Sequence, residues 1–309
     1  NLAINADMSV SCNCQLDDGA GRLGSLAEHE LADIIAGPVA ASFRATLAAG
    51  RLPIAPCAAC HDLQMVDPAG AARRASISAI SEKGILVENT AACNLRCLGC
   101  DRESVRRTHL KHKLAPADIR KIADTIQRHH ITTLYYFKYG EPFLSPTIGD
   151  ELAVIRAVNQ DLRIIISTNA GALDDDTKRE AALQADLIYC SIAGMSDRTL
   201  RRYQRGGSFQ NAYANMRALA DYRRAQGASR PWIEWKYVLF NWNDHPAMLE
   251  QAVALAREAG IDALSFWPTT VPYYGISWRY RSGGLCAKIG QAFPGCRRVY
   301  FRPEQPAMG

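Results

Sequence analysis

The chain has 309 residues, of which 48% are hydrophobic and 22% are charged, and its formal net charge is +5. This length allows one large globular domain, or one domain with a small appendage. The composition excludes a short disulfide scaffold, and no apolar run reaches the roughly 18 residues of a membrane helix. The densest basic stretch, RESVRRTHLKHK at 102–113, has no interleaved aromatic residues. We therefore interpret it as a solvated face and predict no nucleic-acid partner.

The first 83 residues are expected to form a small separate module. Two cysteine pairs, Cys12 with Cys14 and Cys57 with Cys60, flank a region of helical character. Four thiolates supply all the protein ligands that one [4Fe–4S] cluster or one zinc ion requires. Ten cysteines in a long chain with a full-sized core indicate metal thiolates in a reducing compartment, which predicts a cytoplasmic protein.

From residue 84 onward, strand-like and helix-like segments alternate. Strands are predicted at 85–89, 132–138, 162–168, 186–192, 232–240 and 261–268. Helices are predicted at about 116–129, 148–158, 176–184, 198–204, 211–225 and 245–260. This spacing requires parallel pairing, so we predict an α/β fold in which residues 84–268 form an open, partial (β/α)6 TIM-like barrel. Residues 269–309 are expected to cover its mouth.

Three cysteines follow the first predicted barrel strand, in the sequence ACNLRCLGC. Cys93, Cys97 and Cys100 are too few for a structural zinc site or an ordinary [4Fe–4S] cluster, each of which takes four ligands. Three ligands leave one iron open to another molecule. The loop also lies at the carboxyl end of a strand, where barrel enzymes carry out their chemistry.

This spacing resembles the signature of the radical S-adenosylmethionine (SAM) enzymes, and the resemblance covers residues 84–268. It implies a [4Fe–4S] cluster whose fourth iron is chelated by SAM. One electron from the cluster would cleave SAM to methionine and a 5′-deoxyadenosyl radical, which takes a hydrogen atom from the substrate. We therefore also expect an external electron donor such as a flavodoxin- or ferredoxin-like protein.

The stretch Tyr139, Gly140, Glu141 resembles the family's Gly-Gly-Glu-Pro turn, with Tyr139 in place of the first glycine. In the family, the backbone and carboxylate of this turn hold the amino group of SAM. Leu98 stands where an aromatic residue often touches adenine, which implies that Leu98 packs against the adenine ring.

Two later strand ends also resemble SAM-binding segments. Ser167, Thr168 and Asn169 resemble the segment that contacts the ribose. Ser191 and Arg205 resemble the serine and arginine that bind SAM, with the arginine paired to its carboxylate.

The N-terminal segment resembles the auxiliary-cluster module of SPASM-type radical SAM enzymes. That module usually follows the barrel, whereas here it comes first. The resemblance implies that Cys12, Cys14, Cys57 and Cys60 bind a second [4Fe–4S] cluster, and a zinc ribbon is the alternative.

Alternation along WIEWKYVLF places Glu234 and Lys236 on one face of a barrel strand. Charged residues are costly against a packed helix layer, so we expect both to point into the central cavity and contact a polar substrate. The alternative is a buried ion pair with a structural role.

Three cysteines remain. Cys190, adjacent to Ser191, is expected to point towards the helices as a small buried hydrophobe. Cys286 and Cys296 lie in a Gly-rich tail, where a thiol could return a hydrogen atom to a substrate radical and make the enzyme an epimerase. Extra cluster ligation or no role are the alternatives for this pair.

These features predict an enzyme that acts on a small polar metabolite, such as a sugar or an aminoglycoside-like natural product, and epimerises, oxidises or dehydrates it. A radical SAM enzyme that modifies ribosomal peptides is the alternative. A more distant one is a non-enzymatic metal-binding regulator, which would leave the SAM-like motifs without a role.

Overall fold

A computed structural model describes most of the chain, which divides into two compact units. The described residues are 2–12, 19–60, 63–109, 111–281, 292–293 and 296–302. Unit 1 comprises Asn1–Ala92, Asp101–Gly140 and Ala153–Arg163. Unit 2 comprises Cys93–Cys100, Glu141–Leu152 and Ile164–Gly309.

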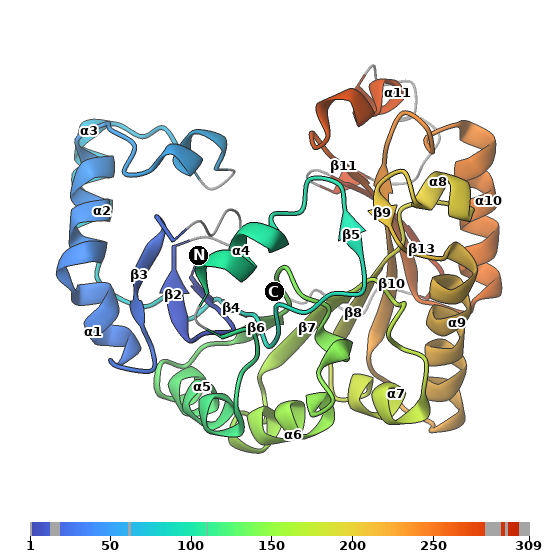
Figure 1. The fold of residues 1–309 in the computed structure, drawn as a ribbon, viewed down its shortest axis with the longest axis horizontal. Coiled ribbons are helices and arrows are strands. Elements are labelled where there is room, and N and C mark those ends of the chain that lie inside the picture. Colours follow the sequence, from blue (N-terminus) through green and yellow to red (C-terminus); the bar gives the residue numbers. More distant parts are fainter. Residues whose placement is uncertain are drawn as a thin grey trace. The chain divides into compact units, whose positions relative to one another are not determined.

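Unit 1 contains a set of short strands, most of which are labelled in Figure 1. They are β1 (Ala3–Ile4), β2 (Ser9–Ser11), β3 (Arg22–Ser25), β4 (Ile85–Val87) and β6 (Thr133–Tyr136). β1 pairs in parallel with β4, and β4 with β6, whereas β2 is antiparallel to β1 and to β3. Residues 3–25 thus extend the same sheet as the first predicted barrel strand, and a separate N-terminal module is not confirmed.

The helices of unit 1 are short, and those at residues 38, 55, 68 and 116 begin with a proline in the first turn. They are α1 (Leu31–Ala36), α2 (Pro38–Ala48), η1 (Ala55–Ala59), α3 (Pro68–Ala75), α4 (Arg102–Thr108) and α5 (Pro116–Arg128). In α5, a first-turn proline precedes Asp118, whose carboxylate accepts a hydrogen bond from Ala115 N at 2.6 Å. Ile119, Ile122 and Ile126 are buried at helical spacing, which confirms the helix predicted at 116–129.

Unit 2 contains a second, mostly parallel set of strands. Its strands are β5 (Arg96–Cys97), β7 (Arg163–Thr168), β8 (Leu187–Ser191), β9 (Gln204–Arg205), β10 (Trp232–Leu239), β11 (Ala263–Pro268), β12 (Ala292–Phe293) and β13 (Cys296–Tyr300). β7, β8, β10 and β11 pair in parallel, and β13 pairs antiparallel with β11 and β12. The predicted α/β class is confirmed, and closure into a partial barrel stays a prediction.

The remaining helices lie beyond residue 141, and α6 belongs partly to unit 2 and partly to unit 1. They are η2 (Pro142–Leu144), α6 (Ile148–Val158), α7 (Asp176–Ala182), α8 (Asp197–Leu200), α9 (Phe209–Ala225), α10 (Pro246–Glu258), η3 (Tyr273–Gly275) and α11 (Trp278–Arg281). The buried indole of Trp235, in the middle of β10, lies 6.4 Å from the Phe209 ring and 6.2 Å from the Tyr213 ring of α9. One face of β10 therefore packs on α9, and alternate residues of the strand occupy its other face.

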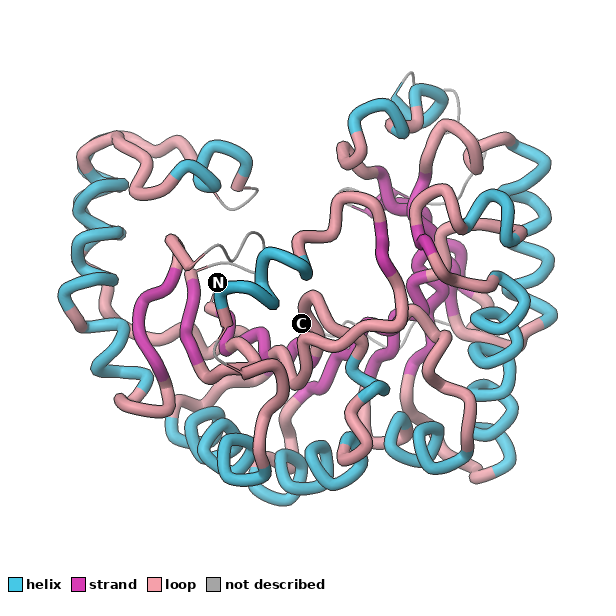
Figure 2. The backbone as a smooth tube through the Cα atoms, viewed as in Figure 1, coloured by secondary structure: helices cyan, strands magenta, loops and turns pink. Residues whose placement is uncertain are grey.

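One helix prediction was wrong in its second half. The helix predicted at 198–204 ends at Leu200, and Gln204 and Arg205 form β9, which pairs with β5 (Figure 2). The composition of RTLRRYQ favours a helix, but β9 gains its hydrogen bonds from a segment about a hundred residues earlier. Long-range pairing of this kind overrides local propensity.

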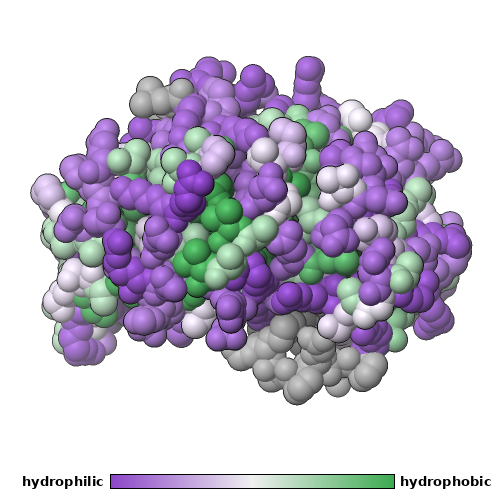
Figure 3. Space-filling view, turned by 90° about the horizontal axis from the view of Figure 1, so that it is seen from below, coloured by the Kyte–Doolittle hydropathy of each residue, from purple (hydrophilic) through white to green (hydrophobic). Residues whose placement is uncertain are grey.

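Within the described ranges, no helix combines the length and the apolar character that a membrane span requires. On the face drawn in Figure 3, most residues are hydrophilic and apolar residues form patches between them.

Candidate active site

Three cysteines lie on one short loop of unit 2. The middle of this cysteine loop is β5, which pairs antiparallel with β9, so that Arg96 lies opposite Arg205. Cys93 and Cys97 are partly buried and Cys100 is exposed. The pairing brings the predicted SAM-binding arginine next to the predicted cluster ligands, although more than a hundred residues separate them in sequence.

Further contacts fix the path of the cysteine loop. Leu98 N donates a hydrogen bond to Tyr203 O at 2.8 Å, which extends the pairing of β5 and β9. Gly99 has a φ of +80°, and a Cβ at this position would lie 2.4 Å from Val271 Cγ1. Only glycine combines this backbone conformation with such a close approach.

Nitrogen donors point at the first thiol. Leu95 N donates to Cys93 Sγ at 3.4 Å, and Asn169 Nδ2 lies within hydrogen-bond distance of the same sulfur at 3.8 Å. Asn169 Nδ2 also donates to Asn94 Oδ1 at 2.8 Å. Such donors stabilise a thiolate, the form in which cysteine binds metal. In the part of the chain that the structure describes, no three His, Cys, Asp or Glu side chains are gathered closely enough to hold a metal ion.

A phenol lies beside the other two thiols. Burial, together with the negative charge of Cys97 and Cys100 when these are thiolates, raises the pKa of Tyr203 to about 12. Tyr203 therefore stays protonated at neutral pH. Tyr203 was not predicted as a site residue from the sequence, in which the nearest predicted site residue is Arg205, two positions later.

The Glu141 carboxylate is buried and accepts three hydrogen bonds from its own chain. Its Oε1 accepts from Thr168 Oγ1 at 2.6 Å and from Phe143 N at 3.3 Å, and its Oε2 accepts from Asn169 N at 2.7 Å. Burial raises its pKa to about 7 even though these hydrogen bonds favour the charged form. The carboxylate thus joins the turn after residue 140 to the end of β7 and orients Asn169. Its predicted contact with SAM stays a prediction.

The ends of β7, β8 and β9 meet through hydroxyl and amide groups. Ser167 Oγ and Ser191 Oγ lie 3.2 Å apart, within hydrogen-bond distance. Gln204 accepts from Ala193 N through Oε1 and donates to Ser191 O through Nε2, both at 2.8 Å. Gln204 therefore joins the end of β8 to β9 and positions Arg205, a role that the sequence did not reveal.

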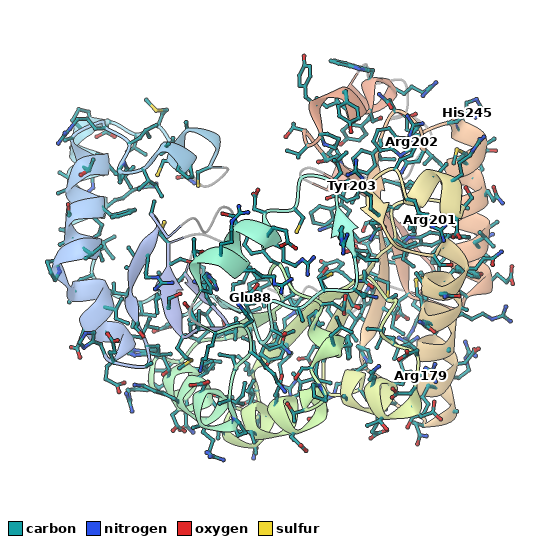
Figure 4. The ribbon with its side chains drawn as sticks, viewed as in Figure 1. Glu88, Arg179, Arg201, Arg202, Tyr203 and His245 are labelled. Carbon is teal, nitrogen blue, oxygen red and sulfur yellow. The ribbon has the colours of Figure 1, made fainter. Side chains whose placement is uncertain are left out.

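In unit 1, the first two residues of the predicted SAM turn follow β6. Tyr139 N donates to Glu88 Oε1 at 3.1 Å, and Lys138 lies over the Tyr139 ring at 5.1 Å. A Cβ at Gly140 would lie 1.7 Å from Thr90 O, so only glycine fits there. Glu88, labelled in Figure 4, is buried, and burial raises its pKa against the opposing effect of Lys138. The sequence did carry a signal for Glu88, an acidic residue directly after the apolar run ILV.

A family model described as the radical SAM superfamily matches residues 87–227. The chain carries a radical SAM domain. Members of this superfamily are enzymes, and the domain implies a [4Fe–4S] cluster and SAM. A comparison with curated proteins found no match.

Several solved structures resemble the chain at low identity. The structure of native anSMEcpe with bound AdoMet and Cp18Cys peptide has 14% identity and a TM-score of 0.47, covering 63% of this chain and 54% of that one. BtrN in complex with AdoMet and 2-DOIA has 16% identity and a TM-score of 0.34, covering 44% and 52%. The radical SAM methyltransferase TsrM from Kitasatospora setae, with tryptophan substrate and aza-SAM bound, has 13% identity and a TM-score of 0.45, covering 67% and 39%. The chain thus spans about half the length of the first two.

The cysteine loop of the radical SAM domain fits an iron–sulfur cluster. Its donor set is three thiols within eight residues, and Cys93 receives hydrogen bonds of the kind that tune cluster sulfurs. Cys93, Cys97 and Cys100 would hold three irons. Arg205, opposite Arg96 in the pairing of β5 with β9, offers a guanidinium next to the loop, a donor suited to a carboxylate.

The face of the unit 2 strands that lies opposite α9 is polar. Across β8, β10 and β11, Lys236 stands between Ser191 and Ser265 in register. Glu234 is almost completely buried on the same face, and Lys236 Nζ lies 4.3 Å from the centroid of the Trp267 ring. Glu234 and Lys236 thus occupy the face opposite the one that packs on α9, as the alternation predicts. Substrate contact stays a prediction.

The N-terminal thiols lie in unit 1. Cys12, Cys57 and Cys60 line one cavity of about 390 Å³, together with apolar residues of α1, α2 and the strands. Burial raises the pKa of Cys12, and the nearby thiols of Cys57 and Cys60 raise it further. Cys14, the fourth predicted ligand, lies outside the described residues.

The last three cysteines differ in what the structure shows of them. Cys190 is completely buried and burial raises its pKa, which confirms the prediction of a small buried residue. Cys296 begins β13, the edge strand beside β11, and its side chain is outside the described part. Cys286 lies outside the described residues altogether. Hydrogen-atom donation by either one stays a prediction.

Proposed function

We propose that the chain is a radical SAM enzyme acting on a small polar metabolite with several hydroxyl or amino groups, such as a sugar or an aminoglycoside-like compound, which it epimerises, oxidises or dehydrates. When bound, the cluster and SAM would supply one electron and a 5′-deoxyadenosyl radical, respectively. The chain's own residues would hold SAM, orient the substrate and exclude water.

The polar sheet face of unit 2 is the observation that supports a polar substrate. A carboxylate, an ammonium group and three serine hydroxyls share this face with the Tyr189 and Trp267 rings, which meet edge to face at 6.2 Å. Carboxylate and ammonium groups match the hydroxyl and amino groups of a sugar, and the face of an aromatic ring suits its C–H surface.

We propose that residues at the ends of β7, β8 and β9 bind SAM. Arg205 would pair with the SAM carboxylate, and Ser191 would donate a hydrogen bond to it. The side-chain amide of Gln204 holds both in place, because it makes one hydrogen bond to Ala193 N and another to Ser191 O. Asn169, oriented by Glu141, would contact the ribose.

We further propose that the thiols in unit 1 bind an auxiliary [4Fe–4S] cluster. The support is that Cys12, Cys57 and Cys60, far apart in sequence, border the same cavity, and that Cys14 is close to Cys12 in sequence. Because the pKa of Cys12 is raised, this thiol binds metal only when the metal displaces its proton.

The proposed function is tested by incubating anaerobically reconstituted enzyme with SAM, dithionite and a panel of aminocyclitols and amino sugars. We expect one compound class to raise the release of 5′-deoxyadenosine above the background without substrate. The Glu234→Gln variant should lose this stimulation but keep the background, whereas Glu258→Gln, an exposed carboxylate on α10, should keep both. Stimulation by peptides alone would refute the proposed substrate class.

The mass of the product identifies the outcome. A mass that is unchanged in H₂O and one unit higher in D₂O indicates epimerisation. A loss of two hydrogens indicates oxidation, and a loss of one water indicates dehydration. If the product gains deuterium, the Cys286→Ala and Cys296→Ala variants show which thiol supplies it. A product that has gained a methyl or thioether group would contradict all three outcomes.

A further inference from the structure

Four aromatic rings form a continuous stack within unit 2. The Tyr203 and Phe240 centroids are 4.7 Å apart, and the Phe240 and Trp242 rings are parallel at 4.6 Å. The Trp242 and Tyr274 rings follow at 6.5 Å. Three successive contacts of this kind form a fixed, close-packed path from Tyr203 to Tyr274, because each ring restricts the next.

The inner end of this aromatic stack contacts the cysteine loop. Tyr203 O accepts the hydrogen bond from Leu98 N. The residues just before the outer end also touch the loop, since Val271 packs against Gly99 so closely that a Cβ would not fit between them. The stack therefore begins at the predicted cluster ligands.

The outer end of the stack is exposed. Tyr274 is 65% exposed, and its neighbours Tyr273 and Trp278 are 74% and 52% exposed. Large aromatic side chains are costly to leave in water, and three within six residues are typical of a surface that docks a partner.

The surroundings of the exposed rings are basic. Residues 198–205 contain four arginines and residues 269–281 contain two, and of these Arg201 is paired with Asp197 and Arg279 with Asp244. The Arg202 guanidinium lies 4.6 Å from the centroid of the Trp242 ring. Arg279 donates to Asn241 O, and Asn241 Nδ2 donates to Tyr274 O at 2.7 Å, so this arginine adjoins the exposed rings. Figure 4 shows Arg202 and Tyr203 on adjoining positions between α8 and β9.

We propose that Tyr273, Tyr274, Trp278 and Arg202 form a docking face for an acidic one-electron carrier protein. The proposal rests on the proposed function, which requires an electron from outside. The carrier would lose one electron and the cluster held by the cysteine loop would gain it, with no proton or other atom transferred. The rings are not themselves reduced: they give a packed, bonded medium between the surface and the thiols.

Position and charge favour such a carrier over other partners. A basic patch steers an acidic protein and orients it on encounter. A peptide substrate or a nucleic acid would also meet aromatic and basic residues here, but neither would need a path to the cysteine loop.

The first test measures binding directly, without turnover. Reconstituted protein is titrated by calorimetry with two acidic probes, an oxidised bacterial flavodoxin and an oxidised two-cluster ferredoxin, at low and at physiological salt. We expect at least one to bind, with an affinity that falls at least tenfold on raising the salt. Arg202→Glu and Tyr273→Ser should each weaken binding at least tenfold, because Arg202 supplies charge and Tyr273 supplies apolar area.

Matched controls lie in unit 1. Arg120→Glu on the exposed side of α5, and Met65→Ser at a side chain that is 95% exposed, repeat the two changes elsewhere and should leave binding unchanged. If neither carrier binds in a salt-sensitive way, or if the controls weaken binding as much as the docking-face variants, the proposal is wrong.

The second test separates this proposal from the proposed function. SAM cleavage without substrate is measured with the reduced carrier and, in parallel, with dithionite, a small reductant that needs no docking face. The docking-face variants should lose at least tenfold with the carrier and keep the dithionite-driven rate. The docking face would be overturned if the variants lost the same fraction of SAM cleavage with both reductants. It would also be overturned if their rates with the carrier were unchanged, the result expected of a peptide or nucleic-acid site. No cleavage by the unaltered enzyme even with dithionite would instead refute the proposed function.

Discussion

The buried carboxylate of Glu141 gives a prediction about stability and pH. Burial raises its pKa from the ordinary value of 4.5 to about 7, in spite of hydrogen bonds from Thr168, Asn169 and Phe143 that favour the charged form. In the unfolded chain, the carboxyl loses its proton near pH 4.5. Between these two values, the folded state therefore keeps a proton that the unfolded state has lost. The free energy of unfolding must fall as the pH rises through this window.

The expected size follows from the shift. A difference of about 2.5 pKa units corresponds to about 3 kcal/mol, lost between about pH 4.5 and pH 7 and constant above and below. Glu141→Gln has nearly the same shape and cannot ionise, so its stability lacks this contribution to the pH dependence. Other titrating groups contribute equally to both proteins and cancel in the difference.

The assay is urea unfolding of the two metal-free proteins, followed by tryptophan fluorescence at pH 5, 6, 7 and 8. We expect the stability of the unaltered protein, minus that of Glu141→Gln, to fall by about 2 to 3 kcal/mol from pH 5 to pH 7 and then level off. A difference that stays flat, or that grows with pH, would refute the assignment of a raised pKa and with it the burial of a carboxylate at this turn.

Three further predictions concern single positions. Gly140→Ala places a Cβ 1.7 Å from Thr90 O, so the backbone must shift, and SAM affinity measured by equilibrium dialysis should fall at least tenfold; unchanged affinity would contradict the predicted role of the turn. Cys190 is completely buried, so Cys190→Ser, which buries a hydroxyl, should lower the melting temperature more than Cys190→Ala, by the equivalent of about 1 to 3 kcal/mol, and the reverse order would be inconsistent with an apolar site. Cys57→Ser should lower the iron content of reconstituted protein from about eight to about four per chain, and a count that starts at four with one zinc would replace the auxiliary cluster by a zinc site.

Several parts of the fold were predictable because their signals are local. The helices α5 and α6 begin and end within one residue of the predicted bounds, since apolar residues recur there at helical spacing. The strands β7, β8, β10 and β11 were predicted for a similar reason, as buried apolar runs separated by helices. The cysteine spacing likewise pointed to the superfamily that the family model matches.

The contacts that depend on distant segments were not predictable. Pairing of β5 with β9 determines where Arg205 lies, and nothing in RTLRRYQ indicates a strand. The bonds of Gln204, and the stack that begins at Tyr203, also depend on how separate segments pack together. The sequence marked Glu141 as functional, but only the structure shows that its carboxylate is already occupied by hydrogen bonds from the end of β7.

The proposed function depends most directly on whether the cysteine loop supports cleavage of SAM. The measurement is the release of 5′-deoxyadenosine and methionine from SAM by anaerobically reconstituted protein with dithionite, quantified by mass spectrometry beside the Cys97→Ser variant. We predict equal amounts of both products from the unaltered protein and only background from the variant. Background amounts from both proteins, with iron present in the unaltered one, would contradict the proposal that this chain is a radical SAM enzyme.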